Sequence, residues 1–430
     1  MSAPSPLANE LPDELLVHVF KQAYALAPLH KSLFAFTISQ VSHKWRQLAL
    51  NTSSLWSIIV LNYSTKPDIL SLILQRNHCA FFDLYIDLRS PNPSISRAII
   101  KRRVWDHLLV LRRLSARWRV LSVLTDIDDD TVNLLATFKE LSSPNLTAFE
   151  VHVERHTRAE FPVAPIVRLF QGGAERLRVI DLDGLPLRAA WPPLGGVRTL
   201  SLNLSCTSMT CADFVRALEE MPRLQSLTID NYNFDLPPLP TGSDDTRVRF
   251  HSPTLLELSV VSLRSDEDFI ARFWSLVSFP ALTTLSLTCH NEEDIPVFAQ
   301  YAQFPALRAL TISHVQGQDH FGELADALPL LEELSVQWCS PEAILYEILS
   351  TDLSEPGESG RDDEPSWPHL HTLSLSNFEG PVLALIDNII ERKKGTPWPL
   401  RKLKVAAMDL NQLLGRDRFE AMGVAVEVIN

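Results

Sequence analysis

The sequence SFPALTTLSL, from Ser278 to Leu287, indicates the fold class because close variants of it recur along the chain. It returns as QFPALRALTI from Gln303 and as SWPHLHTLSL from Ser366. A phrase that begins at the leucine two residues after the proline has apolar residues at positions 1, 4 and 6, with a polar residue between positions 4 and 6. This alternation is the period of a strand with one buried face. Each phrase therefore predicts a short β-strand.

Copies of the phrase extend over most of the chain. Clear copies begin at Leu146, Leu177, Val197, Leu224, Leu255, Leu282, Leu307, Leu331, Leu370 and Leu400, and weaker ones begin at Leu55, Phe81 and Trp118. Successive copies start 20 to 39 residues apart. The residues between copies have helical spacing, as in Cys211–Met221. Because one strand and one helix cannot bury an apolar face alone, we expect such units to stack and share a core.

Prolines mark the start of many of these phrases. A proline two residues before the first apolar position cannot continue a helix, and it biases the preceding residue towards extended backbone. It therefore ends one helix and starts the next strand. These prolines are Pro144, Pro222, Pro253, Pro280, Pro305, Pro329 and Pro368.

The phrase resembles the leucine-rich repeat, whose pattern is L-x-x-L-x-L-x-x-N/C. Leu331–Cys339, LEELSVQWC, matches this pattern in full, whereas most copies depart from it at the last position. The resemblance is therefore to an irregular leucine-rich repeat, and it implies a curved parallel sheet with helices on the outer face. We predict an α/β solenoid over residues 58–430, interrupted by an acidic, disordered loop at 351–367.

The N-terminal sequence LPDELLVHVF, from Leu11, has no copy further along the chain. Pro12 suits a first helical turn, and the two acids that follow it complement the dipole of a helix N-terminus. Two more helical stretches follow, KSLFAFTIS from Lys31 and VSHKWRQLAL from Val41. Three short helices carry more large apolar side chains than so small a unit can bury. We therefore expect an apolar face to remain exposed.

These N-terminal stretches resemble the F-box family, whose pattern runs LP-x-E-L-L-x-x-I/V-F, a spacer, V-C/S-x-x-W-R-x-L-A and then L-W. The chain reads LPDELLVHVF from Leu11, VSHKWRQLAL from Val41 and LW at Leu55. Ser42 stands in place of the commoner cysteine. The resemblance divides the chain into a flexible N-terminus at 1–10, a three-helix F-box at 11–57 and the repeats.

An F-box implies binding to the Skp-type adaptor of a cullin-RING ubiquitin ligase, and through it to the cullin. The residues that would divide between the adaptor interface and the small core of the F-box itself are Leu11, Pro12, Leu15, Leu16, Val19, Phe20, Val41, Trp45 and Leu48. A cap over the open end of the solenoid is the alternative role for these helices, because terminal repeats need a distinct outer face.

Strand positions 3, 5 and 7 are expected to point onto the concave face, which we interpret as the surface for a protein target. Position 5 is a column of small hydroxyls in the later copies, which either packs across strands or leaves a groove open. Candidate target-binding residues, at position 7 and in the loops after the strands, are Asp183, Asp230, Tyr232, His290, His314, Gln337 and Trp338. The loop aromatics are alternatively partly buried anchors.

Composition and charge argue against several other functions. The net charge of −13 disfavours general nucleic-acid binding, which needs a concentrated positive surface. The local exception is Arg97–Arg119, whose single acid is Asp106; this stretch is either a solvated helix face or a site for an acidic partner. The five scattered cysteines suit a reducing compartment, and neither a secretory signal nor a long uncharged apolar run occurs. We expect a soluble protein of the cytoplasm or nucleus without membrane contact.

The sequence contains no G-x-S-x-G, G-x-x-x-x-G-K-[ST], G-x-G-x-x-G or H-E-x-x-H motif. No nearby Cys or acid set completes a zinc site with His152 and His156. We predict a non-enzymatic chain without metal or cofactor: the substrate-recognition subunit of an SCF-type (Skp–cullin–F-box) ubiquitin ligase, monomeric outside the complex and similar to F-box proteins with irregular leucine-rich repeats found in fungi. The alternative is a leucine-rich interaction scaffold unconnected to ubiquitin.

Overall fold

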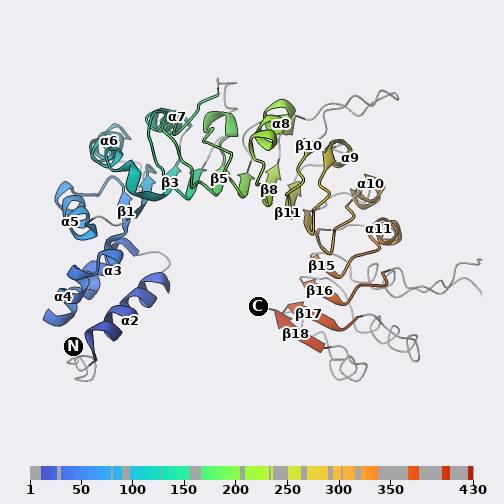
Figure 1. Ribbon diagram of the computed structural model, residues 1–430, viewed down its shortest axis with the longest axis horizontal. Coiled ribbons are helices and arrows are strands. Elements are labelled where there is room, and N and C mark those ends of the chain that lie inside the picture. Colours follow the sequence, from blue (N-terminus) through green and yellow to red (C-terminus); the bar gives the residue numbers. More distant parts are fainter. Residues whose placement is uncertain are drawn as a thin grey trace, which may run out of the picture. The chain divides into compact units, whose positions relative to one another are not determined.

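The chain divides into two compact units, Met1–Val197 and Arg198–Asn430. The computed structural model describes residues 11–26, 31–78, 81–89, 97–126, 128–154, 166–203, 209–231, 234–235, 250–262, 269–288, 294–301, 304–314, 321–337, 367–376, 400–406 and 425–429. Within the described residues, helices and strands alternate along part of each unit (Figure 1). Within these described ranges, no helix has the length and apolar character that a membrane span requires.

The first unit begins with three helices and a short 3-10 turn. These are α2 (Asp13–Leu26), α3 (Lys31–Ile38), α4 (His43–Asn51) and η1 (Ser53–Trp56). Helix α4 begins after Ser42, whose hydroxyl accepts a hydrogen bond of 3.2 Å from the backbone N–H of Trp45. This bond satisfies an N–H group that has no partner within the helix. Helix α4 and η1 each contact both α2 and α3, so the four elements form one bundle.

The strands of the first unit pair in parallel and in chain order. They are β1 (Ile58–Leu61), β2 (Phe82–Asp87), β3 (Trp118–Thr125), β4 (Ala148–Val153) and β5 (Val179–Asp183). Ile59 lies opposite Leu84, and Leu84 lies opposite Leu121, so each strand is placed directly beside the preceding one. Helices α5 (Pro67–Asn77), α6 (Arg97–Arg112) and α7 (Asp128–Ala136) lie along one side of these strands (Figure 1). We call the opposite side of the strands the open face.

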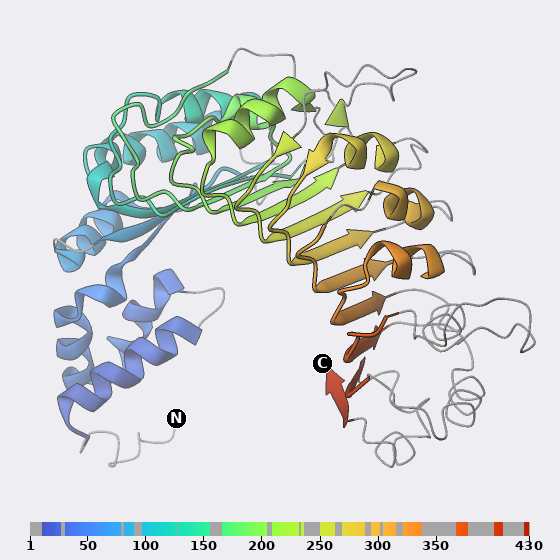
Figure 2. The same cartoon turned by 45° about the vertical axis from the view of Figure 1, so that its right-hand side comes forward.

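The second unit repeats the same arrangement. Its parallel strands, again in chain order, are β6 (Thr199–Asn203), β8 (Ser226–Asn231), β11 (Glu257–Ser262), β13 (Thr284–Thr288), β14 (Ala309–Ser313), β15 (Glu333–Gln337), β16 (Thr372–Ser376), β17 (Lys402–Ala406) and β18 (Ala425–Ile429). The helices on one side of them are α8 (Cys211–Glu220), α9 (Phe269–Leu276), α10 (Asp294–Tyr301) and α11 (Phe321–Ala327), as Figure 2 shows. The other side of these strands is the open face of the second unit.

Two short strand pairs lie outside this sheet in the second unit. They are β7 (Met209–Thr210) with β9 (Phe234–Asp235), and β10 (Phe250–His251) with β12 (Val277–Ser278). Each member of these pairs is two residues long, so they join neighbouring repeats at single points rather than along a face.

The leucines of the repeated phrase fill the core between strands and helices. In SFPALTTLSL, Leu282, Leu285 and Leu287 are almost wholly buried, as is Phe279 before the proline. Each buried side chain of this size contributes roughly 1.5–3 kcal/mol to stability. Ser286 alternates with them and is partly exposed on the open face. The strand predicted at each phrase is present.

Position 2 of the phrase joins neighbouring repeats through the backbone. The carbonyl of Thr283 accepts hydrogen bonds from the N–H groups of Arg308 and Ala309, at 2.9 and 3.0 Å. The carbonyl of Arg308 accepts in the same way from Glu332 and Glu333, at 2.8 and 2.9 Å. Because the backbone makes these bonds, position 2 tolerates a different side chain in each copy.

One strand was not expected from the sequence, and one predicted loop lies mostly outside the described residues. Strand β18 follows no copy of the phrase, because its alternating Val426 and Val428 lack the preceding proline and leucine anchor. The acidic loop predicted at 351–367 lies outside the described residues, except for Trp367, which is buried.

Candidate functional site

Helix α2 has two apolar faces with different environments. Leu16 and Phe20 are only 1% and 2% exposed, whereas Leu15 and Val19 are 52% and 51% exposed. Residues four apart lie one above the other on a helix, so each pair forms its own stripe. One stripe packs inside the bundle, and the other is free of contacts that would bury it.

The inner stripe packs against aromatic residues of the following elements. The rings of Phe20 and Trp45 meet edge to face with centroids 4.8 Å apart, and those of Phe36 and Trp56 do so at 5.0 Å. Trp56 also donates from Nε1 to the carbonyl oxygen of Ala49 at 2.8 Å. Leu16 and Phe20 therefore stabilise the bundle, and neither side chain offers surface to a partner in this conformation.

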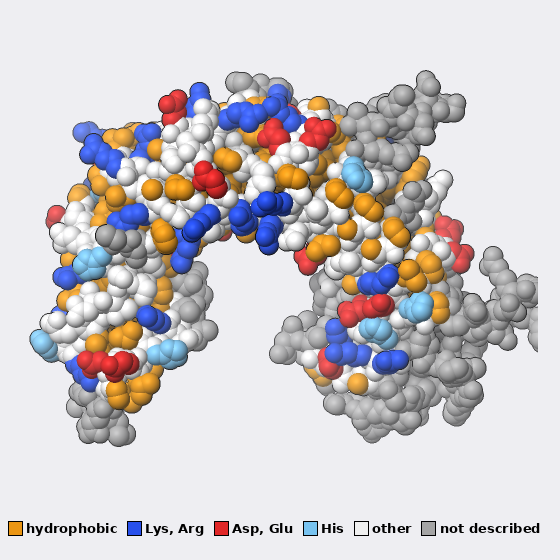
Figure 3. Space-filling view, in the orientation of Figure 1, with side chains coloured by type: hydrophobic (Ala, Val, Ile, Leu, Met, Phe, Trp, Pro, Cys, Tyr) orange, Lys and Arg blue, Asp and Glu red, His pale blue; other side chains and the backbone are white. Residues whose placement is uncertain are grey.

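The outer stripe of α2 is extended by residues near the starts of α2 and α4. Lys44 connects these starts, because its Nζ donates to the carbonyl oxygen of Leu11 at 2.7 Å and lies 3.1 Å from the carboxylate of Asp13. This places Leu11 and Val41, both exposed, at the same end of the bundle. Figure 3 shows hydrophobic surface next to acidic side chains at the end of the bundle where α2 begins.

The nine candidate adaptor-binding residues thus fall into three groups by exposure. Trp45 and Leu48 are half-buried, and Leu16 and Phe20 are buried. The exposed ones, which form the surface that we call the apolar docking face, are Leu11, Pro12, Leu15, Val19 and Val41. Contiguous exposed apolar surface is typical of protein interaction sites, so these five residues form the candidate site for a partner.

The helical bundle joins the first strands without a linker. Only Ser57 separates η1 from β1, and its carbonyl oxygen accepts a hydrogen bond of 2.8 Å from the N–H of Asp83 in β2. Asn77, at the end of α5, donates from its side chain to the carbonyl oxygen of Trp56 at 3.3 Å. The bundle and the first strands therefore share one core, which fixes the docking face relative to the start of the sheet.

A polar cluster on β2 and β3 lies where the helical bundle meets the first strands. The buried carboxylate of Asp83 accepts two hydrogen bonds from Arg119, at 2.8 and 2.7 Å. Tyr24, near the end of α2, lies close to this pair, and burial raises the pKa of its hydroxyl to about 12. The phenol of Tyr24 therefore stays neutral at physiological pH.

The open face of the first unit is rich in carboxylates. His152 on β4 lies beside two acids of β5, with Nδ1 at 3.7 Å from Asp183 and Nε2 at 4.0 Å from Asp181. The carboxylate of Asp183 is the main cause that raises the pKa of His152, although partial burial opposes it. Glu150 on β4 lies opposite Asp181 and adds to the negative charge. Asp183, a predicted target-binding residue, therefore interacts with a histidine of the neighbouring strand.

No metal site arises from these groups. Among the described residues, no set of three or more His, Cys, Asp and Glu side chains is arranged to hold a metal ion. His156, the other histidine of the sequence HVERH, lies outside the described residues. The acids beside His152 come from the next strand, and only the strand register identifies them.

The open face of the second unit has small uncharged side chains in one row from β6 to β16, and this row continues with Lys404 on β17 and Glu427 on β18. The strand register aligns one row of hydroxyl groups across it: Ser201, Thr228, Ser259, Ser286, Thr311, Ser335 and Ser374. The neighbouring row contains Asp230 and Gln337, which were predicted as target-binding residues. His314 directly follows β14, has a positive φ of 60° and donates its N–H to the carbonyl oxygen of Gln337 at 2.9 Å.

The remaining target-binding candidates, Tyr232, His290 and Trp338, lie outside the described residues. The structure thus brings His314 and Gln337 together, and it places Asp230 in the same row of the sheet as Gln337. Asp183 lies in the other unit. The sequence candidates on the strands therefore belong to two open faces of different charge.

Comparison with known proteins bears on the N-terminal bundle. A family model described as F-box-like matches residues 8–62, a range that includes α2, α3, α4, η1 and β1. No curated protein matches the chain. Residues 8–62 therefore form an F-box-like domain, a class of domain that generally binds Skp-type adaptors. Proteins with such a domain are generally non-catalytic adaptors of ubiquitin ligase complexes.

Proposed function

We propose that this chain, whose residues 8–62 form an F-box-like domain, is the target-recognition subunit of an SCF-type ubiquitin ligase. In this proposal the apolar docking face binds the Skp-type adaptor, which connects the chain to a cullin. The observation that carries the proposal is the division of α2 into a buried stripe with Leu16 and Phe20 and an exposed apolar stripe with Leu15 and Val19.

The energetics of the docking face support adaptor binding. Leu11, Leu15, Val19 and Val41 are each roughly half exposed, so a partner that covers them removes apolar area that the fold itself leaves in water. Complete burial of such a side chain is worth roughly 1.5–3 kcal/mol, so covering the exposed half contributes on the order of 1 kcal/mol for each. The bundle does not need these side chains for its own core.

The target would bind to the repeats, which we interpret as irregular leucine-rich repeats. In this scheme the chain needs no catalytic group, because holding a target near the ubiquitin-loaded thioester raises the effective concentration of its lysines. The shared core of the bundle and the first strands supports this scheme, since it joins the docking face to the strands with which the repeats begin.

Co-expression with a Skp-type adaptor and a cullin tests the assignment. The expected result is a single complex of the three proteins in size-exclusion chromatography. Elution of this chain apart from an intact adaptor–cullin complex contradicts the proposal.

We place the target on the open face of the second unit, where the hydroxyl row lies, and this requires a separate test because the partner is not identified. Affinity purification from cells treated with a proteasome inhibitor would compare the wild type with Ser286→Arg/Thr311→Arg, which places two large cations in the hydroxyl row. Glu219→Arg, on the exposed side of α8, is the matched control. Proteins recovered with the wild type and the control, but lost with the double variant, support the proposal. The same set of proteins with all three chains contradicts it.

A leucine-rich scaffold with an N-terminal cap is the second candidate, and one observation favours a capping role. Helix α3 contacts β1 and η1, so the bundle lies against the first strand of the sheet. Capping and adaptor binding use different surfaces and are compatible. The exposed stripe with Leu15 and Val19 distinguishes the candidates, because a cap alone has no use for it.

A further inference from the structure

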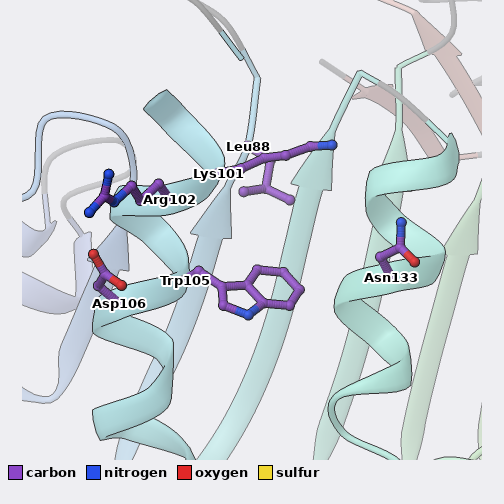
Figure 4. A pocket seen from close by; sticks show the side chains of 6 residues that line it. All are labelled: Leu88, Lys101, Arg102, Trp105, Asp106 and Asn133. Atoms are coloured by element: carbon purple, nitrogen blue, oxygen red, sulfur yellow. The ribbon is translucent and has the colours of Figure 1, made fainter. Parts of the chain in front are cut away.

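A groove lies on the helix-covered side of the first unit, between α6 and α7. Its volume is about 330 Å³, and its lining residues are Leu88, Lys101, Arg102, Trp105, Asp106 and Asn133. Figure 4 shows Lys101 and Trp105 extending from α6 towards α7, where Asn133 is located. Leu88, which is buried directly after β2, lies between the two helices. The groove therefore combines an apolar interior with charged and polar groups at its rim.

The outer side of α6 adds apolar surface next to this groove. Ile99, Leu109 and Val110 are each about half exposed. A helix that covers a sheet needs one apolar stripe, and α6 already has one, formed by Ile100, Val104, Leu108 and Leu111, all of which are buried. The fold thus leaves three large apolar side chains of α6 in contact with water, and none of them is part of the core formed by the described residues.

The charge of the same surface is positive. Lys101, Arg102 and Arg103 are exposed, and Asp106 is the acid of this helix. Figure 3 shows Lys and Arg side chains beside hydrophobic ones over this part of the first unit. Arginine pairs with carboxylates through two parallel hydrogen bonds, so exposed arginines beside an apolar groove favour an acidic ligand with an apolar anchor.

We propose that the groove between α6 and α7 binds a peptide segment of a partner protein in which a large apolar residue is flanked by acidic residues. The apolar side chain enters the groove against the ring of Trp105, and a flanking carboxylate pairs with Arg102 on the outer side of α6. The exposed arginines belong to α6, so the acidic residues of the peptide lie on the α6 side of the groove. This site is separate from the docking face and from the open face, and does not depend on adaptor binding.

A peptide fits this surface better than a lipid bilayer does. The indole and Leu88 line a concave groove, and a concave site of this size has room for a large apolar side chain. A bilayer would contact the protruding side chains of α6 and leave the groove empty. Binding of anionic vesicles is therefore a distinct outcome of the test.

Selection of random peptides displayed on phage against the full-length chain tests the proposal. The expected result is enrichment of peptides with Leu, Phe or Trp flanked by Asp or Glu. The best peptide, labelled with fluorescein, should bind the wild type in a fluorescence anisotropy titration. Its affinity should be about tenfold lower for Arg102→Glu or Leu109→Glu. Both positions are exposed, so these variants keep the fold even if Trp105→Ala does not. The affinity of this peptide for the wild type should also fall with added salt.

Ile69→Glu is the matched control, because Ile69 is a similarly exposed apolar residue on the neighbouring helix α5. It should leave the affinity for the peptide unchanged. The proposal is overturned by no enrichment, by enrichment of basic peptides or by equal binding to Arg102→Glu and the wild type. It is also overturned if phosphatidylserine vesicles bind in a Leu109-dependent manner while no peptide does.

Discussion

Phe20 and Trp45 pack edge to face in the core of the N-terminal bundle, with ring centroids 4.8 Å apart and an interplanar angle of 61°. Val19, the residue before Phe20, is half exposed on the outer side of the same helical turn. Adjacent residues of α2 therefore have different roles, one in the core and one on the docking face. Substitutions at the two positions should separate folding from binding.

We expect Phe20→Ala to destabilise the bundle by about 3–5 kcal/mol, because it removes a buried aromatic side chain and leaves a cavity beside Trp45. Val19→Ala should change stability by less than about 0.5 kcal/mol, since Val19 is exposed. Amide hydrogen exchange of α2 and α4 measures both values in the full-length chain. Equal effects of the two substitutions would show that the two stripes of α2 are not as assigned.

Trp56→Phe tests whether the bundle and the sheet share one core. The substitution removes the hydrogen bond from Nε1 to Ala49, so we expect a loss of about 1–2 kcal/mol in the local stability of both α4 and β1. Trp105→Phe, a half-exposed tryptophan of α6, is the control and should leave both elements unchanged. Faster exchange in α4 alone would argue against the shared core.

The pair Asp83 and Arg119 should contribute modestly to stability, because Arg119 is half exposed although Asp83 is buried. A double-mutant cycle with Asp83→Asn and Arg119→Met should give a coupling free energy of about 1 kcal/mol that decreases with added salt. Thermal unfolding of the four proteins measures it. Zero coupling at low salt would mean that the two hydrogen bonds do not persist in solution.

His152 should titrate above its ordinary pKa of 6.5, because the carboxylate of Asp183 stabilises the imidazolium. A raised pKa in the folded state stabilises the fold at pH values below 6.5, and this contribution disappears as the pH rises through the folded-state pKa. An NMR titration of the His152 ring measures the pKa. Asp183→Asn should lower it, and an unchanged value in that variant would exclude Asp183 as the cause.

The repeat could be predicted from the sequence because each strand carries its own signal. Alternation at Leu285, Ser286 and Leu287 defines the buried face without knowledge of any neighbour. Strand β18 was not predicted because the proline and the first leucine of the phrase are missing there, although Val426 and Val428 alternate around Glu427. Local pattern was therefore sufficient where the anchors were complete.

The division of α2 could not be predicted, because Leu15, Leu16, Val19 and Phe20 lie within one broad apolar arc of the helix. Only the position of α4, which brings Trp45 against Phe20, decides which residues become core. Tertiary packing is needed for such a decision.

The sequence also did not predict that Asp181 and Asp183 lie beside His152. They belong to β5, a strand about 30 residues further along the chain, and only the register of β4 with β5 brings them to His152. The roles of Tyr232, His290 and Trp338, which lie outside the described residues, stay predictions.

Adaptor binding through the docking face is tested by the affinity of the full-length chain for a purified Skp-type adaptor, measured by isothermal titration calorimetry. Leu15→Asp/Val19→Asp should weaken binding about 100-fold, because it places two charges on the docking face. The far-ultraviolet circular dichroism should not change, because both positions are exposed. Ile69→Asp, on an exposed position of α5, should bind like the wild type. An affinity of the double variant equal to that of the wild type, or no binding by either, would contradict adaptor binding through the docking face.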